Sequence, residues 1–303
     1  MDSKKIRKEI SRYIGWLGLS FSSLIVKIIP LGCLYGFARS MSFLGYRFAG
    51  KQRKVALESL SIAFGNEKNS REKEKIARDC FTFMAKAGLE LMFLMDKPKL
   101  LKKRVGIAGK ENLDSALAQG RGVILVSAHF GNFPLMMARL AIAGYKIGGL
   151  MRPMHDNRAE RMFVQKRSKL GIKTIYTQPR AACVNETLGA LRNNEIVFIP
   201  IDQHFGSGGV YVDFFGTKAA TATGPVIFAQ RTKAAMLPCF IIRQPDDTHK
   251  IVFEPAITLA EGKGSEETVL INIQKLTDVI EKYIRRYPAE WGWIHRRWKD
   301  KQS

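Results

Sequence analysis

The sequence predicts an α/β fold in which a mostly parallel central sheet has helices on both faces and is preceded by an N-terminal membrane-associated helical segment. Three continuous apolar runs have the length of buried strands and fall at 122–128, 195–201 and 236–242. Buried strands that alternate with helices are typical of parallel sheets. The helical patterns lie near 131–143, 157–170, 181–192, 223–233 and 268–286.

The N-terminal segment is assigned to residues 1–45, and a second domain to residues 46–303. A basic start precedes an apolar stretch at 13–38, which Lys27 and Pro30 interrupt. A single clean span needs about 20 consecutive apolar residues. The interruptions therefore favour a kinked or shallow helix at the membrane interface, with Lys27 reaching the headgroups. A single span and a buried hairpin of the core remain the alternatives.

A further helix follows this segment, with Ser70 as its predicted N-cap. Its apolar residues recur at spacings of three and four, which places them on one face. They are Ile76, Cys80, Phe83, Met84, Ala87 and Leu91. At the other end, the chain closes on an aromatic and basic tail at 291–298.

The net charge of the chain is strongly positive, because 49 basic residues stand against 27 acidic ones for a total of +22. Such an excess favours an anionic partner, either nucleic acid or a phospholipid surface. The basic residues are spread along the whole chain, and the N-terminal segment favours a membrane, so we expect no nucleic-acid partner. Four basic residues after that segment favour the cytoplasmic face of the inner membrane. They are Arg47, Lys51, Arg53 and Lys54.

Candidate catalytic residues lie just beyond the carboxyl ends of the predicted strands, where chemistry collects in parallel sheets. His129 leaves the first apolar run and precedes a helix, whose start offers amide donors for an anion. Its imidazole titrates near neutrality and can accept a proton from a hydroxyl group. A loop histidine with only a structural hydrogen bond is the alternative.

Asp202 follows the second apolar run and reaches the same edge of the sheet if the two strands are near neighbours. A carboxylate there can fix the histidine tautomer and stabilise its protonated form. A metal site using Asp202 and His204 lacks a third ligand at a suitable spacing, so we expect no metal and no cofactor. The four cysteines are far apart in the sequence and predict reduced thiols rather than a disulfide framework.

Two arginines, Arg152 and Arg158, follow the next predicted strand end. A guanidinium group in such a place can bind a phosphate or carboxylate through two parallel hydrogen bonds. A solvated surface arginine is the alternative for each of them.

Four ordered blocks resemble the lipid A late acyltransferases of Gram-negative bacteria, a branch of the lysophospholipid acyltransferase superfamily. The resemblance extends over about residues 45–300, and the set is specific although each block alone is weak. The blocks are Arg53-KVALESLSIAF, Val126-SAHFGN, Pro200-IDQHFGSGGVYVDFFGTKAATATG and Tyr287-PAEWGWIHRRW.

The resemblance implies that the domain at 46–303 is an acyltransferase. Its donor would be an acyl thioester, acyl carrier protein or acyl-CoA, and its acceptor a hydroxyl group of a lipid A precursor or related anionic glycolipid. His129 matches the family's base, and Asp202 matches a position where the wider group also has an acid. The expected substrate-binding residues are Asn132, Arg152, Arg158, Phe215, Gly216 and Thr221. Acyl chains would fit a groove of Phe130, Phe133, Phe214 and Phe215, for which ordinary core aromatics are the alternative.

The sequence departs from the family pattern at one catalytic position. The pattern is His-x(4)-Asp or Glu, and Pro134 stands at the acidic position. No carboxylate can orient His129 from there, so the orienting role is assigned to Asp202. The change leaves open an enzyme that acylates a different lipid or glycan, or a catalytically silent lipid-binding protein. A second departure, Lys218 in place of the usual proline, has no mechanism attached to it.

Overall fold

The computed structural model of the chain describes residues 9–10, 13, 16–18, 20, 24, 26, 28–154, 156–206 and 208–299. The other residues of the predicted membrane segment, Lys27 among them, lie outside the described residues. The described residues between 9 and 28 are helical. In this part of the chain, no helix combines the length and the apolar composition needed to cross a membrane.

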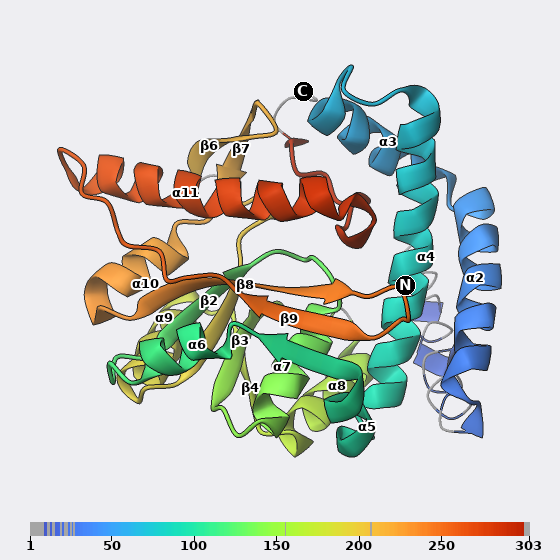
Figure 1. The fold of residues 1–303 in the computed structure, drawn as a ribbon, viewed down its shortest axis with the longest axis horizontal. Helices are drawn as coiled ribbons and strands as arrows, with labels where there is room; N and C mark the ends of the chain where they lie inside the picture. The colour runs from blue at the N-terminus through green and yellow to red at the C-terminus, as the bar shows by residue number, and fades with distance from the viewer. Residues whose placement is uncertain are drawn as a thin grey trace.

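A seven-stranded sheet lies at the centre of the described chain, in the order β1-β9-β8-β2-β5-β3-β4 (Figure 1). Neighbouring strands in it run parallel, apart from the antiparallel pair β8 and β9. The predicted α/β fold with a mostly parallel sheet is thus confirmed. The strands are β1 (Val105–Ala108), β2 (Val123–Ser127), β3 (Ile147–Met151), β4 (Ile172–Tyr176), β5 (Ile196–Pro200), β8 (Ala235–Arg243) and β9 (His249–Phe253).

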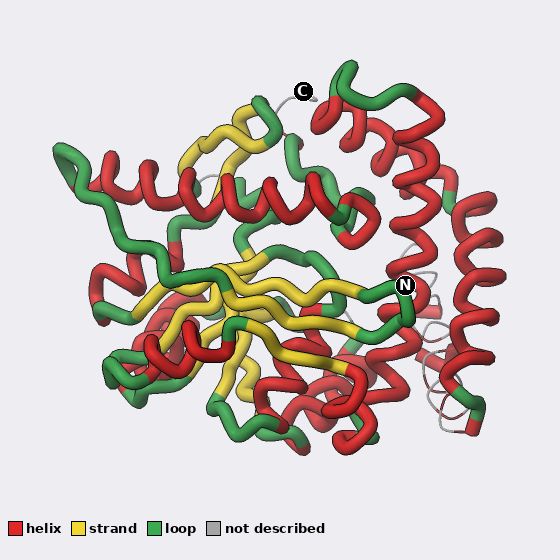
Figure 2. Tube along the Cα trace, in the orientation of Figure 1, coloured by secondary structure: helices red, strands yellow, loops and turns green. Residues whose placement is uncertain are grey.

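Helices cover both faces of the sheet (Figure 2). Because successive side chains of a strand point to opposite faces, Ile124 and Val126 join the hydrophobic cluster under α9, α10 and α11. Val123 and Leu125 join the cluster on the other face, under α5, α6, α7 and α8. The helices are α5 (Pro98–Arg104), α6 (Lys110–Leu117), α7 (Phe133–Ile142), α8 (Asn157–Lys169), α9 (Arg180–Arg192), α10 (Gly224–Thr232) and α11 (Ser265–Arg286).

Three N-terminal helices stand at one end of the sheet: α2 (Leu31–Phe48), α3 (Gly50–Phe64) and α4 (Ser70–Leu94) (Figure 1). The longest of them, α4, lies between the sheet and α2. Its N-cap is Asn69 rather than the predicted Ser70. The Asn69 side chain accepts from the Glu72 amide at 3.0 Å, and the Glu72 side chain accepts from the Asn69 amide at 2.8 Å. This reciprocal pair is a capping box.

Candidate active site

The carboxyl ends of β2 and β5 bring His129 and Asp202 together. These strands are parallel neighbours, with Ser127 opposite Pro200, so the chain leaves both strands at the same edge of the sheet. His129 Nδ1 lies 2.8 Å from Asp202 Oδ1. Asp202 is buried, whereas 35% of the His129 side chain is exposed. The imidazole is thus held from behind by a carboxylate and keeps an open side toward solvent.

The pair favours an ionised carboxylate beside a basic imidazole. Burial would raise the pKa of Asp202, but the attraction of His129 and the hydrogen bonds it accepts outweigh burial and lower that pKa to about 2. Burial would likewise lower the pKa of His129, but the charge of Asp202 and the hydrogen bond between them raise it above its usual value. Asp202 therefore remains charged near neutrality and stabilises a proton on His129.

The C-terminal tail supplies a third member of this site, which sequence reasoning did not place there. The indole Nε1 of Trp291 donates to Asp202 Oδ2 at 2.8 Å. Trp291 also forms an isolated antiparallel bridge with Phe130, next to the histidine. Its partner lies 89 residues away in sequence, and no strand-end rule points to the tail, so the sequence carries no signal for this contact.

Asn132 faces α4 through its side-chain amide. Its Nδ2 donates to the Ala87 carbonyl and to Glu90 Oε2, both at 3.1 Å. Asn132 is also the N-cap of α7. It ends the loop at 128–132 that carries His129, called the histidine loop below. The structure therefore ties the start of α7 to α4 at this point, and the predicted contact of Asn132 with substrate stays a prediction.

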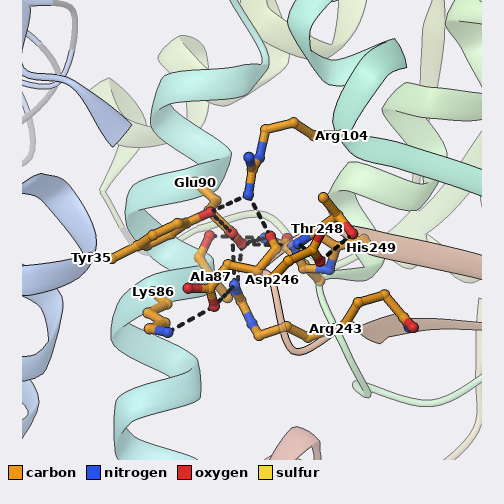
Figure 3. A network of polar contacts seen from close by, with 12 residues as sticks. Tyr35, Lys86, Ala87, Glu90, Arg104, Arg243, Asp246, Thr248 and His249 are labelled. Carbon is orange, nitrogen blue, oxygen red and sulfur yellow. Dashed lines mark hydrogen bonds and ion pairs between the residues drawn. The ribbon is translucent and has the colours of Figure 1, made fainter. Parts of the chain in front are cut away.

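Glu90, which accepts from Asn132, is the centre of a buried polar network (Figure 3). Its carboxylate bonds to Tyr35 Oη from α2 at 2.5 Å and to His249 Nε2 from β9 at 3.0 Å. Arg243 from β8 donates to both carboxylate oxygens, at 2.8 and 2.6 Å. Burial would raise the pKa of Glu90, but His249 and Arg243 outweigh it and lower that pKa to about 2. A charged Glu90 thus joins α2, α4, the sheet and Asn132.

The two arginines predicted to bind phosphate differ in their surroundings. Arg152 directly follows β3 and is exposed. Arg158, in the first turn of α8, pairs with Asp156 at 2.5 Å and stacks over the rings of Tyr13 and Trp16 at 5.0 and 5.2 Å. Because β3 and β5 run parallel, both arginines follow the same carboxyl-terminal edge of the sheet as Asp202.

The other predicted binding residues belong to an antiparallel hairpin, β6 (Val210–Phe214) and β7 (Thr217–Thr221). Phe215 and Gly216 form its turn, and both have positive φ, 54° and 65°, as a type I′ turn requires. Thr221, at the end of β7, is fully buried. None of the three touches His129 in the contacts described for these residues. Their binding roles stay predictions.

Arg297 of the tail joins this hairpin to the loop that carries Asp202. Its buried guanidinium donates to the carbonyls of Gln203 and Ala220 and to Thr221 Oγ1. Burial lowers the pKa of Arg297 to about 10, against the opposing charge of Asp202. A buried cation held by neutral acceptors thus contacts the loop that carries Asp202.

The aromatic residues considered for an acyl groove are mostly core residues. Phe130, Phe214 and Phe215 are at most 5% exposed, and Phe214 and Phe215 pack against Trp298. Phe133 is half-buried and contacts the His129 ring edge-on at 5.3 Å. Of the four, Phe133 is therefore the one placed beside the base. Among the described residues, no group of three or more His, Cys, Asp or Glu side chains is arranged to hold a metal ion.

Comparison with known proteins places the chain in a family. The profile of the bacterial lipid A biosynthesis acyltransferases matches residues 1–300. The chain is 26% identical over 298 residues to the lipid A biosynthesis palmitoleoyltransferase of Escherichia coli K12, covering 95% of this chain and 91% of that protein. It is 23% identical over 291 residues to the lauroyltransferase of the same organism, covering 95% and 92%.

A second group of relatives, which matches less of the chain, is named for a different activity. The chain is 28% identical over 193 residues to the phosphatidylinositol mannoside acyltransferase of Mycobacterium tuberculosis, covering 63% of this chain and 59% of that protein. The profile match over nearly the whole chain decides the assignment. The protein belongs to the bacterial lipid A biosynthesis acyltransferase family, a family of O-acyltransferases.

Proposed function

We propose that the protein transfers a fatty acyl chain from an acyl thioester, carried by acyl carrier protein, to a hydroxyl group of a lipid A precursor or related glycolipid. The observation that carries the proposal is the His129–Asp202 pair, 2.8 Å apart at the open edge of the sheet. It supplies a base with one exposed side and a buried carboxylate behind it. The acyl and glycolipid chemistry follows the named activities of the relatives.

The proposed reaction is direct transfer. His129 Nε2 takes the hydroxyl proton as the acceptor oxygen attacks the thioester carbonyl, and Asp202 stabilises the resulting imidazolium. The carbon–sulfur bond then breaks, the ester forms, and the proton on His129 passes to the leaving thiolate. Backbone amides or a basic side chain would stabilise the negative charge on the carbonyl oxygen.

The acceptor's phosphate is assigned to Arg152 and Arg158, at the end of β3 and the start of α8. An exposed guanidinium offers a phosphate two parallel hydrogen bonds, and Arg152 is exposed. Asn132 and the hairpin residues Phe215, Gly216 and Thr221 complete the proposed acceptor side. Acyl-CoA is the alternative donor.

The protein is proposed to work at the cytoplasmic face of the inner membrane, attached through its N-terminal segment and α2. Four large apolar side chains of α2 share one helical stripe, because they are spaced by four, three and four residues. They are between 47% and 80% exposed: Phe37, Met41, Leu44 and Phe48. Another side of α2 packs on α4 through Leu34, Tyr35, Ala38 and Ser42. An exposed apolar stripe flanked by basic residues suits an anionic lipid surface.

Replacing these four residues of the stripe by serine tests the attachment. Binding of the full chain to vesicles of phosphatidylethanolamine and phosphatidylglycerol should weaken at least about tenfold, since each buried apolar side chain contributes about 1.5–3 kcal/mol. The control is Leu270→Ser, an exposed apolar residue on α11, which should leave vesicle binding unchanged. Equal binding of the serine variant and the parent would contradict attachment through α2.

Two alternatives keep the same fold. An acceptor other than lipid A is favoured by the similarity to phosphatidylinositol mannoside acyltransferases. A catalytically silent lipid-binding protein is favoured by Pro134 at the family's acidic position.

Mass spectrometry of the lipids of cells that lack the gene separates these possibilities. The proposal predicts a lipid A lighter by one acyl group, restored by the parent gene and not by His129→Ala. A different glycolipid lighter by one acyl group would identify the other acceptor. An unchanged lipid profile would support the silent protein.

A further inference from the structure

Both oxygens of the Asp202 carboxylate have a fixed partner. Oδ1 lies 2.8 Å from His129 Nδ1, and Oδ2 accepts from Trp291 Nε1 at 2.8 Å. Asp202 and Trp291 are 4% and 2% exposed, respectively, so water does not compete freely for either bond. A carboxylate held at one oxygen cannot rotate its other oxygen away from the imidazole without losing a hydrogen bond.

Trp291 is itself held to the loop that carries the base. It pairs with Phe130 in an isolated bridge, and the preceding residue, Glu290, accepts the Gly131 amide through its carbonyl at 2.9 Å. The Trp291 carbonyl accepts from Cys80 Sγ at 3.1 Å. The indole is therefore fixed relative to α4 and to the histidine loop, and not only to Asp202.

The structure assigns to Trp291 the role of a positioning residue, which we propose orients Asp202 so that its Oδ1 meets the proton on His129 Nδ1. Trp291 is buried and donates to Asp202, so it acts through the carboxylate. An indole N–H can only donate, so it binds an oxygen of Asp202 and cannot itself accept the proton that His129 Nδ1 donates to the carboxylate. The inference rests on the proposed function, because it needs His129 to work as the base.

A second consequence concerns the basicity of the pair. A carboxylate that accepts a hydrogen bond is less basic than one that does not. The hydrogen bond from Trp291 therefore weakens the stabilisation that Asp202 gives to the protonated imidazole. Removing the N–H should raise the pKa of His129 and move the acidic limb of the rate profile to higher pH.

The rival role for Trp291 is packing alone. Its ring lies against Trp293 at 4.6 Å and against Phe214 at 5.7 Å. Trp298 belongs to the same cluster, is equally buried, and donates its N–H to the Phe214 carbonyl at 3.3 Å. Trp298→Phe therefore removes the same atoms from the same cluster without touching Asp202, and it is the matched control for Trp291→Phe.

The test compares pH–rate profiles of the full-length variants in detergent. The donor probe is acyl carrier protein loaded with a C12, C14 or C16 chain, and the acceptor probe is a phosphorylated, acylated disaccharide. Trp291→Phe should lower kcat about ten- to one hundred-fold, the usual effect of losing a hydrogen bond to a charged group. KM should change less than about twofold, and the acidic limb should move to higher pH. Trp298→Phe should show neither change.

A second variant removes the N–H without reducing the volume of the ring. Benzothienylalanine at position 291 replaces the N–H by sulfur and keeps the two fused rings. It should reproduce the shift of the acidic limb even if Trp291→Phe does not fold. A parental profile for this variant would overturn the proposal, as would equal losses in Trp291→Phe and Trp298→Phe with no shift of the limb.

A double variant separates failure of this inference from failure of the proposed function. If Trp291 acts through Asp202, Trp291→Phe should cause no further loss in an Asp202→Asn background. A purely structural role would multiply the two losses and overturn the inference. Should Asp202→Asn and His129→Ala keep parental activity, the proposed function itself would fail.

Discussion

Asp202→Asn is the substitution whose effect the structure defines most closely. The side chain keeps its shape but becomes an amide with one acceptor oxygen and one donor nitrogen. Trp291 can only donate and lies 2.8 Å from Oδ2, so the amide oxygen turns toward it. The amide nitrogen then faces His129 Nδ1, which must become the acceptor and leave its proton on Nε2. In that tautomer the exposed nitrogen cannot take a proton from a hydroxyl group.

The expected loss in kcat is about 10⁴, the effect of the comparable change in a serine-protease triad. Loss of the negative charge adds to the wrong tautomer, because the imidazolium loses its stabilisation. The assay is acyl transfer from acyl carrier protein under saturating donor, followed by mass spectrometry. Asp278→Asn, an exposed carboxylate on α11, is the control and should stay within about twofold of the parent. Near-parental activity of a folded Asp202→Asn protein would refute the dyad.

Three more predictions follow from the described contacts. His129 must be neutral to act as a base, and its pKa is raised. The acidic limb of the kcat/KM profile should therefore have its midpoint above about 6.5, the pKa of an ordinary histidine. A midpoint below that value would contradict the pairing. Pro134→Glu should be neutral or mildly activating, since an acid suits the first turn of α7, and a tenfold loss of activity would show that this proline is needed to begin the helix. Glu90→Gln should lower the free energy of unfolding by about 3–5 kcal/mol, because it removes the buried charge that Arg243 binds at both carboxylate oxygens and leaves Asp247 as its charged partner. Tyr35→Phe should cost less; urea unfolding that ranks the two variants the other way would contradict the network in Figure 3.

The sequence was informative where burial is uniform. The central strands β2, β5 and β8 are buried along nearly their whole length, so they read as continuous apolar runs. Short or partly exposed strands such as β1 and β4 have no such run and were not predicted. The hairpin turn at Phe215-Gly216 also gave no signal, because only one of its two residues is a type that favours positive φ.

The site was predictable only where it follows from the strand ends. His129 and Asp202 each come just after a buried strand, and the parallel pairing of β2 with β5 brings them together. Trp291 arrives from the far end of the chain by a tertiary contact that local patterns do not encode. Glu90 did carry a signal, an acidic residue within the apolar stretch Leu89-ELMFL. Its partners, however, come from distant elements that only the fold brings together.

The rate of acyl transfer by His129→Ala shows whether His129 is the base on which the proposed chemistry depends. The measurement is single-turnover transfer from acyl carrier protein to the phosphorylated, acylated disaccharide, with vesicle binding and thermal unfolding as checks on folding. We expect a rate about 10²–10⁴ below that of the parent, with both checks unchanged, because the exposed side of the ring contributes chemistry rather than packing. A folded His129→Ala protein within about twofold of the parental rate would contradict this assignment.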